Sequence, residues 1–251
     1  MNAANLAGTP TPVTFNGDGK TFQGELYLPE NATNPRPLVV VVHGWWGKSK
    51  HPIAQARRIS DELGYAALAV DLYGDGTTVG TPREAQALAA PFYKDPSLGV
   101  ERIRHFIAAA PKNSVDVSKI VCIGYCFGGT QSLNLFRSGG MPDGAKLLGV
   151  ASFHGGLSSS LKPEGPVDVK ILVFHGAADK LVTDQDVTAF QAEMEKAHAK
   201  LTFIAYPGAL HAFTDPDATR IGKEFNLPIA YDAKADKESW QKLKEFLEET
   251  F

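Results

Sequence analysis

The chain has 251 residues, of which 43% are hydrophobic and 21% charged, and its 25 basic and 28 acidic side chains give a net charge of −3. This composition is typical of a folded enzyme and excludes disordered and fibrous chains, while the weak acidic charge argues against nucleic acid or a membrane as partner. The length suits one α/β unit, so we expect a single domain over residues 1–251, with residues 1–20 as an N-terminal extension or edge segment.

Apolar runs and helical patterns alternate from residue 20 onward, which indicates an α/β fold. The expected strands are Thr21 to Tyr27, Leu38 to Val42, Ala66 to Val70, Ile120 to Ile123, Leu147 to Phe153, Ile171 to Phe174 and Leu201 to Ala205. Several of these runs are apolar throughout, as in a mostly parallel sheet with helices on both faces. The expected helices are Ile53 to Leu63, Ala85 to Phe92, Val100 to Ala109, Gly128 to Phe136, Thr183 to Ala197 and Ala235 to Leu247.

Two irregular stretches are predicted to be loops, Leu72 to Pro82 and Thr214 to Pro228. In an open parallel sheet, ligands bind beyond the carboxyl ends of the strands, where such loops meet. We therefore expect the functional site at that edge of the sheet.

The cysteine count and the apolar runs limit the cellular setting. The two cysteines, Cys122 and Cys126, are four residues apart and suggest neither a disulfide framework nor a zinc site. The longest apolar runs are shorter than the ~18 residues of a membrane-spanning helix. Met1 to Pro12 lack the pattern of a signal peptide, but a mature secreted or periplasmic form would look the same as a cytoplasmic protein, so the sequence leaves the compartment open.

The most informative stretch runs from Ile120 to Gly129, where an apolar strand leads into Gly-Tyr-Cys-Phe-Gly-Gly and a helical pattern. A nucleophile on such a turn needs small residues two positions before and after it, which Gly124 and Gly128 provide. Cys126 is therefore the predicted nucleophile, and we expect the helix dipole and a neighbouring imidazole to lower the pKa of its thiol. The alternative is a buried structural cysteine, which is what we expect of Cys122 within the strand.

A base and an acid follow the predicted nucleophile in the order that α/β hydrolases use. Asp179 ends a small-residue loop after a predicted strand and is the candidate that orients the base, and His211 follows a later strand and turn as the candidate base. Asp184 and Asp186 compete for the acid role, although aspartates at the start of a helix ordinarily cap it.

The remaining histidines are interpreted by their positions. Three of them end predicted strands and could border the site, as residues that support it rather than catalyse: His43, His154 and His175. Three others fall in or beside helical patterns and are predicted to be solvated or capping residues: His51, His105 and His198.

An acyl-transfer site also needs donors that stabilise an oxyanion. The segment His43 to Gly47 follows a hydrophobic strand, as the oxyanion-contributing loop does in this fold. The backbone N–H groups of Trp45 and Phe127 are therefore the predicted oxyanion-hole donors. No dinucleotide fingerprint, Walker motif or metal-ligand cluster is found, so no cofactor or metal is expected.

Together these segments resemble the dienelactone hydrolase (carboxymethylenebutenolidase-like) family, the cysteine members of the α/β-hydrolase superfamily, from about Phe22 to the C-terminus. The resemblance rests on five segments: His43 to Gly47, Asp71 to Gly76, Gly124 to Gly129, His175 to Asp179 and His211 to Phe213. It implies an α/β-hydrolase fold and hydrolysis of esters or lactones by Cys126, His211 and Asp179 through a thioester intermediate, without metal or cofactor.

Two departures from the family pattern bear on specificity. Family members usually carry a glutamate where this chain has Gly44, so thiol activation must depend on His211 and the turn. Arginines that hold the carboxylate of dienelactone are replaced by Asp75 and Asp215, which favours neutral or weakly polar esters. The side chains expected to bind substrate are Trp46, Tyr73, Asp75, Tyr125, His154, Phe213 and Asp215.

The predicted function is thus cleavage of a small-molecule ester or lactone by a monomer or small homo-oligomer. A non-catalytic binding protein with the same fold is one alternative, because fold alone does not guarantee activity. A thiol-dependent acyltransferase, which would use the same chemistry with a different acceptor, is the other.

Overall fold

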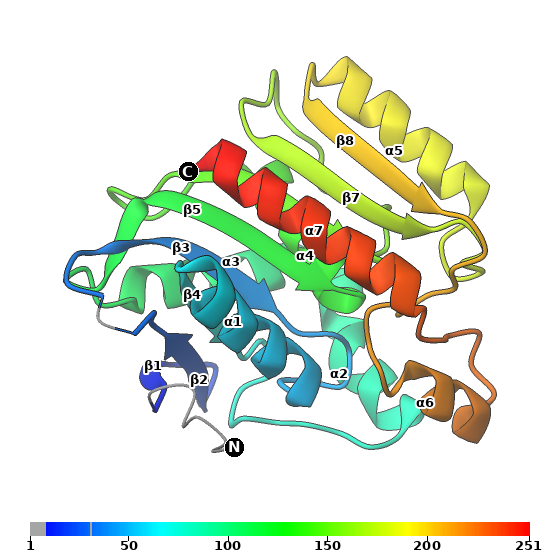
Figure 1. Cartoon of the computed structure of the whole chain (residues 1–251), viewed down its shortest axis with the longest axis horizontal. Coiled ribbons are helices and arrows are strands. Elements are labelled where there is room, and N and C mark those ends of the chain that lie inside the picture. The colour runs from blue at the N-terminus through cyan, green and yellow to red at the C-terminus, as the bar shows by residue number, and fades with distance from the viewer. Residues whose placement is uncertain (1–8, 31) are drawn as a thin grey trace, which may run out of the picture.

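The structure, a computed structural model, describes residues 9–30 and 32–251 (Figure 1). Within these residues eight strands form one sheet in the order β1-β2-β4-β3-β5-β6-β7-β8. Six neighbouring strands of this sheet run parallel: β4, β3, β5, β6, β7 and β8. The strands β1 and β2 add an antiparallel edge beside β4. The predicted mostly parallel α/β sheet is confirmed. The strands are β1 (Thr11–Gly17), β2 (Lys20–Tyr27), β3 (Arg36–Val42), β4 (Ala66–Val70), β5 (Val115–Tyr125), β6 (Leu147–Phe153), β7 (Lys170–Gly176) and β8 (Lys200–Tyr206).

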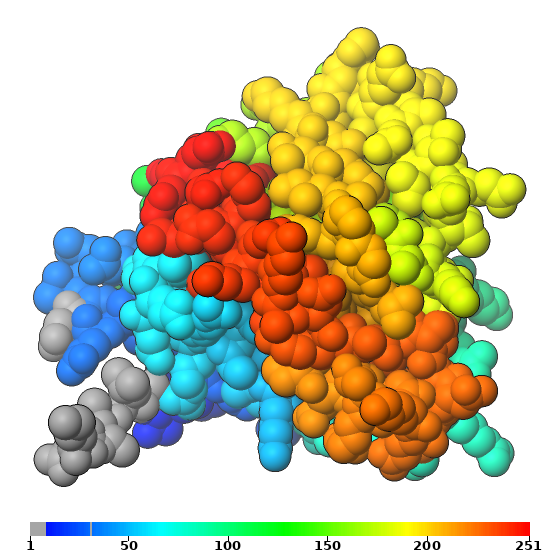
Figure 2. Space-filling view, turned by 45° about the vertical axis from the view of Figure 1, so that its right-hand side comes forward, coloured from blue at the N-terminus to red at the C-terminus, as the bar shows by residue number. Residues whose placement is uncertain are grey.

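Helices cover both faces of the sheet, which explains the continuously apolar strands. Val41 of β3 packs towards the face that carries α1 and α7, and Val40 packs towards the face that carries α2 to α5. On the first face α1 and α7 form the outer surface (Figure 2). The helices are α1 (Lys50–Leu63), α2 (Pro82–Lys94), α3 (Ser97–Ala109), α4 (Phe127–Arg137), α5 (Asp184–Lys196), α6 (Ala218–Phe225) and α7 (Ala233–Thr250).

The edge strand β1 was not expected as a separate strand. It pairs with β2 through a two-residue turn, Asp18 and Gly19, whose φ angles are 52° and 71°. Left-handed backbone at both positions is typical of a tight β-hairpin, and Asp-Gly is its sequence signal. Residues 11–17 therefore form an edge segment, one of the two roles expected for the N-terminal region, while residues 1–8 lie outside the described part of the chain.

The stretch Thr214 to Pro228, predicted to be a loop, contains the short helix α6. This prediction was wrong because eight residues with Gly222 inside them give a weak helical pattern. The chain passes close to Gly222, since a Cβ atom there would lie 2.4 Å from the carbonyl oxygen of Ile229. Asn226 ends the helix in the left-handed conformation, with φ 53°. After the helix the chain returns to the His211 loop, where the backbone N–H of Ala230 donates to the carbonyl oxygen of His211 at 3.2 Å.

Candidate active site

Cys126 occupies the turn between β5 and α4. Its φ is 55° and its ψ is −117°, a strained conformation for a non-glycine residue. A Cβ atom at Gly124 would lie 2.0 Å from the carbonyl oxygen of Gly128, and one at Gly128 would lie 2.3 Å from that of Val42. Only glycine fits these two positions, so the sequence Gly-Tyr-Cys-Phe-Gly holds the thiol on a tight strand-to-helix turn.

The surroundings of the Cys126 thiol favour the thiolate. Burial alone would raise its pKa, but the charge of the neighbouring imidazole of His211 and the nearby backbone N–H groups of Phe127 and Trp45 together lower it. The predicted donors, Trp45 and Phe127, therefore both lie beside the thiol of Cys126 and favour its charged form. The turn brings these groups together because α4 begins directly after the thiol.

His211 and Asp179 form a buried pair beside the thiol. Nδ1 of His211 lies 2.8 Å from Oδ2 of Asp179, while Oδ1 of Asp179 accepts hydrogen bonds from the backbone N–H groups of Leu181 (2.7 Å) and Val182 (3.3 Å). Burial opposes a charged imidazole, yet the neighbouring Cys126 and Asp179 raise the pKa of His211 to about 10. Hydrogen bonds at both of its oxygens thus fix the orientation of Asp179, which in turn holds His211 with Nε2 towards Cys126.

The two competing acids, Asp184 and Asp186, lie at the start of a helix and, within the described chain, make no hydrogen bond to His211. Asp186 and Thr183 form a capping box at the N-terminus of α5, and Asp186 also accepts a hydrogen bond from Ser158 at 2.7 Å. Asp184 lies in the first turn of the same helix. Both are helix-terminal residues, and only Asp179 bonds His211.

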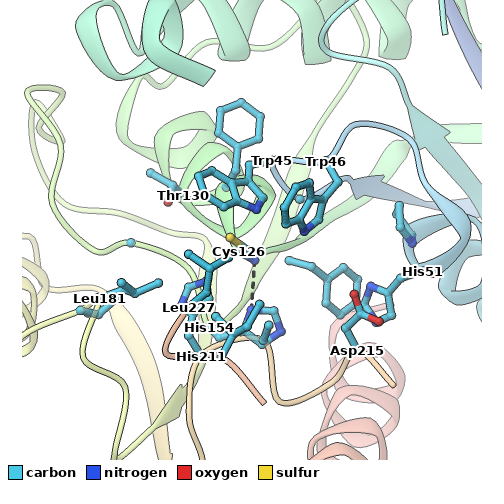
Figure 3. A pocket seen from close by; sticks show the side chains of 18 of the residues that line it. Trp45, Trp46, His51, Cys126, Thr130, His154, Leu181, His211, Asp215 and Leu227 are labelled. Carbon is cyan, nitrogen blue, oxygen red and sulfur yellow. Dashed lines mark hydrogen bonds between the residues drawn. The ribbon is translucent and has the colours of Figure 1, made fainter. Parts of the chain in front are cut away.

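Cys126 and His211 open into a cavity of about 480 Å³ (Figure 3). Aromatic and aliphatic side chains make up most of its walls, namely Trp45, Trp46, Tyr93, Tyr125, Phe127, Leu157, Leu181, Val182, Leu227 and Ile229. Asp186 and Asp215 are its acidic residues, and among the described lining residues there is no lysine or arginine. The cavity therefore suits an apolar substrate and offers no lysine or arginine to a carboxylate.

Four of the seven residues expected to bind substrate line this cavity: Trp46, Tyr125, His154 and Asp215. The other three do not. The Tyr73 hydroxyl donates to the carbonyl oxygen of Trp45 at 3.0 Å, and Phe213 packs beneath His154 with ring centroids 5.1 Å apart. Asp75 accepts a hydrogen bond from the backbone N–H of Thr21 at 3.1 Å, which holds it against the β1–β2 hairpin. Tyr73 and Phe213 thus support the walls from behind, and Asp75 is remote from the thiol.

His154 links the turn to the loop after His211. Its Nδ1 accepts a hydrogen bond from the backbone N–H of Cys126 at 3.2 Å, and its Nε2 lies 2.8 Å from Oγ1 of Thr214. Burial, reinforced by the charges of His211 and His51, holds the pKa of His154 well below its usual range. His154 therefore favours the neutral form and connects the Cys126 turn to Thr214.

His51 was predicted to be a solvated or capping residue, but it is a cavity residue. It lines the cavity from the first turn of α1, and its Nε2 donates to the carbonyl oxygen of Thr214 at 3.0 Å. The helical pattern around His51 suggested a solvated or capping position. The sequence could not reveal the true position, because contact with Thr214, 163 residues away, leaves no local signal. By contrast, His43 is buried in the core, where its Nε2 accepts from the N–H of Leu72 at 3.0 Å and burial lowers its pKa to about 4.

Gly44, the position of the missing acid, faces the thiol. A Cβ atom at Gly44 would lie 3.8 Å from Cβ of Cys126 and 3.5 Å from the carbonyl oxygen of Tyr125, both ordinary contacts. The Cβ atom of a larger residue would therefore fit there. The absence of a side chain leaves His211 as the ionisable group that acts on Cys126.

Across residues 9–30 and 32–251, no group of three or more His, Cys, Asp or Glu side chains is arranged to hold a metal ion. None of the described helices combines the length and the apolar character needed to span a membrane.

Residues 22–251 match the sequence model of the dienelactone hydrolase family. A relative from Caenorhabditis elegans, uncharacterized protein K02A2.1, is 39% identical over 139 residues, which cover 55% of this chain and 84% of that protein. A relative from Escherichia coli K12, named "Putative carboxymethylenebutenolidase", is 26% identical over 88% of this chain and 80% of its own. The crystal structure of a dienelactone hydrolase-like promiscuous phosphotriesterase from metagenomic libraries is 32% identical, with a TM-score of 0.84, over 97% of this chain and 100% of that one.

Proposed function

The chain belongs to the dienelactone hydrolase family of α/β-hydrolases, and we propose that it cleaves carboxylic esters or lactones with Cys126 as nucleophile. One observation carries this proposal. The thiol of Cys126 lies beside the imidazole of His211 and the backbone N–H groups of Trp45 and Phe127, and these groups together lower its pKa. These are the groups that acyl transfer requires: an activated nucleophile, a base and two oxyanion donors.

The mechanism begins with the proton on His211 and Cys126 as a thiolate, the state favoured by the pair because the pKa of Cys126 is lowered and that of His211 is raised. The thiolate attacks the carbonyl carbon of the ester, and the carbonyl π-bond electrons move onto its oxygen. The N–H groups of Trp45 and Phe127 then bind the new oxyanion in place of the sulfur that they contact at rest.

Collapse of this tetrahedral intermediate breaks the bond between the carbonyl carbon and the alcohol oxygen, and His211 gives its proton to that oxygen. The product alcohol leaves and the acyl group remains on Cys126 as a thioester. Asp179 keeps the imidazole in the required orientation throughout, through its 2.8 Å hydrogen bond to Nδ1.

Deacylation repeats these steps with water as the nucleophile. Neutral His211 removes a proton from the water, which attacks the thioester carbon and forms a second oxyanion at the same two N–H groups. When this intermediate collapses, the carbon–sulfur bond breaks, the acid is released, and the thiolate–imidazolium pair of Cys126 and His211 is restored.

Trapping the thioester tests this proposal directly. After mixing with p-nitrophenyl acetate and quenching in acid, mass spectrometry of the digested protein should locate an acetyl group on the peptide that contains Cys126. Turnover without acylation of Cys126 would contradict the proposal, and absence of both would favour a non-catalytic binding protein. Transfer of the acetyl group to an added alcohol or amine in preference to water would instead identify an acyltransferase.

Hydrolysis of neutral phosphotriesters is a second candidate activity. It is supported by the 32% identical phosphotriesterase and by the cavity, which is largely apolar and has no lysine or arginine among its described lining residues. Attack of the Cys126 thiolate on phosphorus would expel the alkoxide or phenoxide leaving group. Release of p-nitrophenol from a neutral p-nitrophenyl phosphotriester, lost in Cys126→Ala, tests this activity.

A further inference from the structure

The cavity has two ends of different chemistry, which lie on either side of Cys126. In Figure 3, Thr130 and Leu181 lie on one side of the thiol, and Trp46, His51 and Asp215 lie on the other. We refer to the group of Trp46, His51 and Asp215 as the Asp215 end. The proposed chemistry at Cys126 does not use these three side chains, so their arrangement needs a separate explanation.

Asp215 gives this end a negative charge. Within the described chain its side chain accepts one hydrogen bond, from the N–H of Asp217 to Oδ1 at 2.9 Å, which leaves Oδ2 available to a ligand. His51 does not offset the charge, because burial lowers its pKa and its Nε2 is engaged with Thr214. Asp236, which interacts electrostatically with His51 from behind the wall, adds a second carboxylate.

Two positive features lie near this end, and neither cancels its charge. Arg58 interacts with Asp236 and stacks on the ring of Trp240 at 3.7 Å, outside the cavity. The N-terminus of α1, where Ser49 makes no side-chain capping bond, carries a partial charge of about half a unit. A full carboxylate on Asp215 outweighs that partial charge, so the Asp215 end remains negative.

Aromatic side chains complete the environment. The rings of Trp46 and Trp45 pack edge to face with centroids 5.1 Å apart, and Tyr125 packs edge to face on His51 at 4.7 Å. Trp46 and Tyr125 both line the cavity. The face of an indole or phenol ring attracts cations, and a carboxylate beside such rings is the combination that recognises ammonium groups.

We propose that the Asp215 end binds a positively charged group of the substrate, so that the preferred ester carries an ammonium group in its alcohol or acyl part. The inference rests on the proposed function, since the ester bond must lie at Cys126. It goes beyond a preference for uncharged esters, because it requires attraction by Asp215 and not merely the absence of a carboxylate-binding arginine.

A matched pair of esters tests the inference. Acetylcholine and 3,3-dimethylbutyl acetate have the same shape and differ in the charge of one atom, and their hydrolysis can be followed by pH-stat titration. We expect kcat/KM to be about tenfold higher for acetylcholine at low ionic strength. The ratio should fall at about 0.5 M salt, where screening shortens the range of the Asp215 charge.

Substitution of Asp215 tests the origin of that ratio. In Asp215→Asn the ratio should fall to within about twofold of one, because the carboxylate is lost and the shape is kept. Asp217→Asn is the control, since Asp217 has the same charge two residues away, is exposed and does not line the cavity. A wild-type ratio of one or below, or a ratio that survives Asp215→Asn, would overturn the inference even if both esters are hydrolysed.

A binding measurement separates this inference from the proposed function. Tetramethylammonium should bind saturably to the wild-type protein, measured by the fluorescence of its tryptophans, and about tenfold more weakly to Asp215→Asn. Such binding without Cys126-dependent hydrolysis of any ester would sink the proposed function alone. Hydrolysis that depends on Cys126, without saturable binding of tetramethylammonium, would sink the ammonium site alone.

Discussion

Cys122 and Cys126 lie four residues apart, one within β5 and the other on the turn that follows it, yet their thiols differ in character. Cys122 is fully buried in the core, where its one hydrogen-bond partner is the Ser132 hydroxyl at 3.6 Å, and burial raises its pKa to about 12. Burial acts on Cys126 in the same direction, but His211 and two backbone N–H groups reverse the sign. The direction in which the thiol pKa shifts is therefore set by the turn and its neighbours and not by the residue type.

The two cysteines should differ most in how strongly their replacement lowers catalytic activity. We predict that Cys126→Ala lowers kcat for p-nitrophenyl acetate by at least ~10³-fold, because the variant keeps only binding and oxyanion stabilisation. Cys122→Ala should stay within about threefold of wild type and cost ~1–2 kcal/mol of folding free energy for the lost core volume. Steady-state kinetics and thermal melts of both variants provide the comparison, and equal losses of activity would refute it.

The second largest effect should come from the histidine that distinguishes the two thiols. His211→Ala should lower kcat by at least ~10²-fold, the usual effect of losing a general base. Asp179→Asn keeps the size of the side chain and should also reduce kcat, because a neutral amide stabilises the imidazolium less well. His175→Ala is a control, since His175 ends β7 close to Asp179 but does not line the cavity.

The pH dependence of activity should reflect the pair that Cys126 forms and Cys122 does not. The thiolate–imidazolium form exists above the lowered pKa of Cys126 and below the pKa of about 10 of His211. We therefore expect kcat/KM to rise as Cys126 loses its proton and to fall as the pH passes about 10. A profile that rises steadily up to the ordinary pKa of a cysteine, ~8.5, would show that no such pair exists.

The smallest effect concerns Gly44. Gly44→Glu would place a carboxylate beside Cys126 and raise the pKa of its thiol by about one unit, with a threefold to tenfold loss of thiol reactivity near neutral pH. Gly44→Gln is the matched control, because it has the same size without the charge. Iodoacetamide labelling rates of the two variants measure the difference, and equal rates would mean that size alone acts at this position.

The chemistry of the turn could be predicted from the sequence because its determinants are local. Gly124, Gly128 and the strand before Cys126 specify the turn within a few residues, and the order of Asp179 and His211 along the chain then suggests the partners. The parallel sheet could also be predicted from the sequence, because a sheet covered on both faces has strands that are apolar throughout.

The cavity walls were harder to predict because they depend on packing between distant segments. Tyr73 and Phe213 follow the carboxyl ends of parallel strands, but their side chains turn into the core. Asp75 is held by a hydrogen bond from Thr21, which lies 54 residues earlier in the chain. His51 enters the cavity through its contact with Thr214, which no periodicity reveals. The helix α6 has too few residues to give a clear pattern.

The pH dependence of alkylation of the two cysteines tests the central claim most directly. Peptide mass spectrometry after brief exposure to iodoacetamide reports Cys126 and Cys122 in the same sample. We predict that Cys126 reacts well below the ordinary cysteine pKa of ~8.5, that this reactivity moves to higher pH in His211→Ala, and that Cys122 stays unlabelled while the protein is folded. A Cys126 profile that is the same in wild type and His211→Ala would contradict the account.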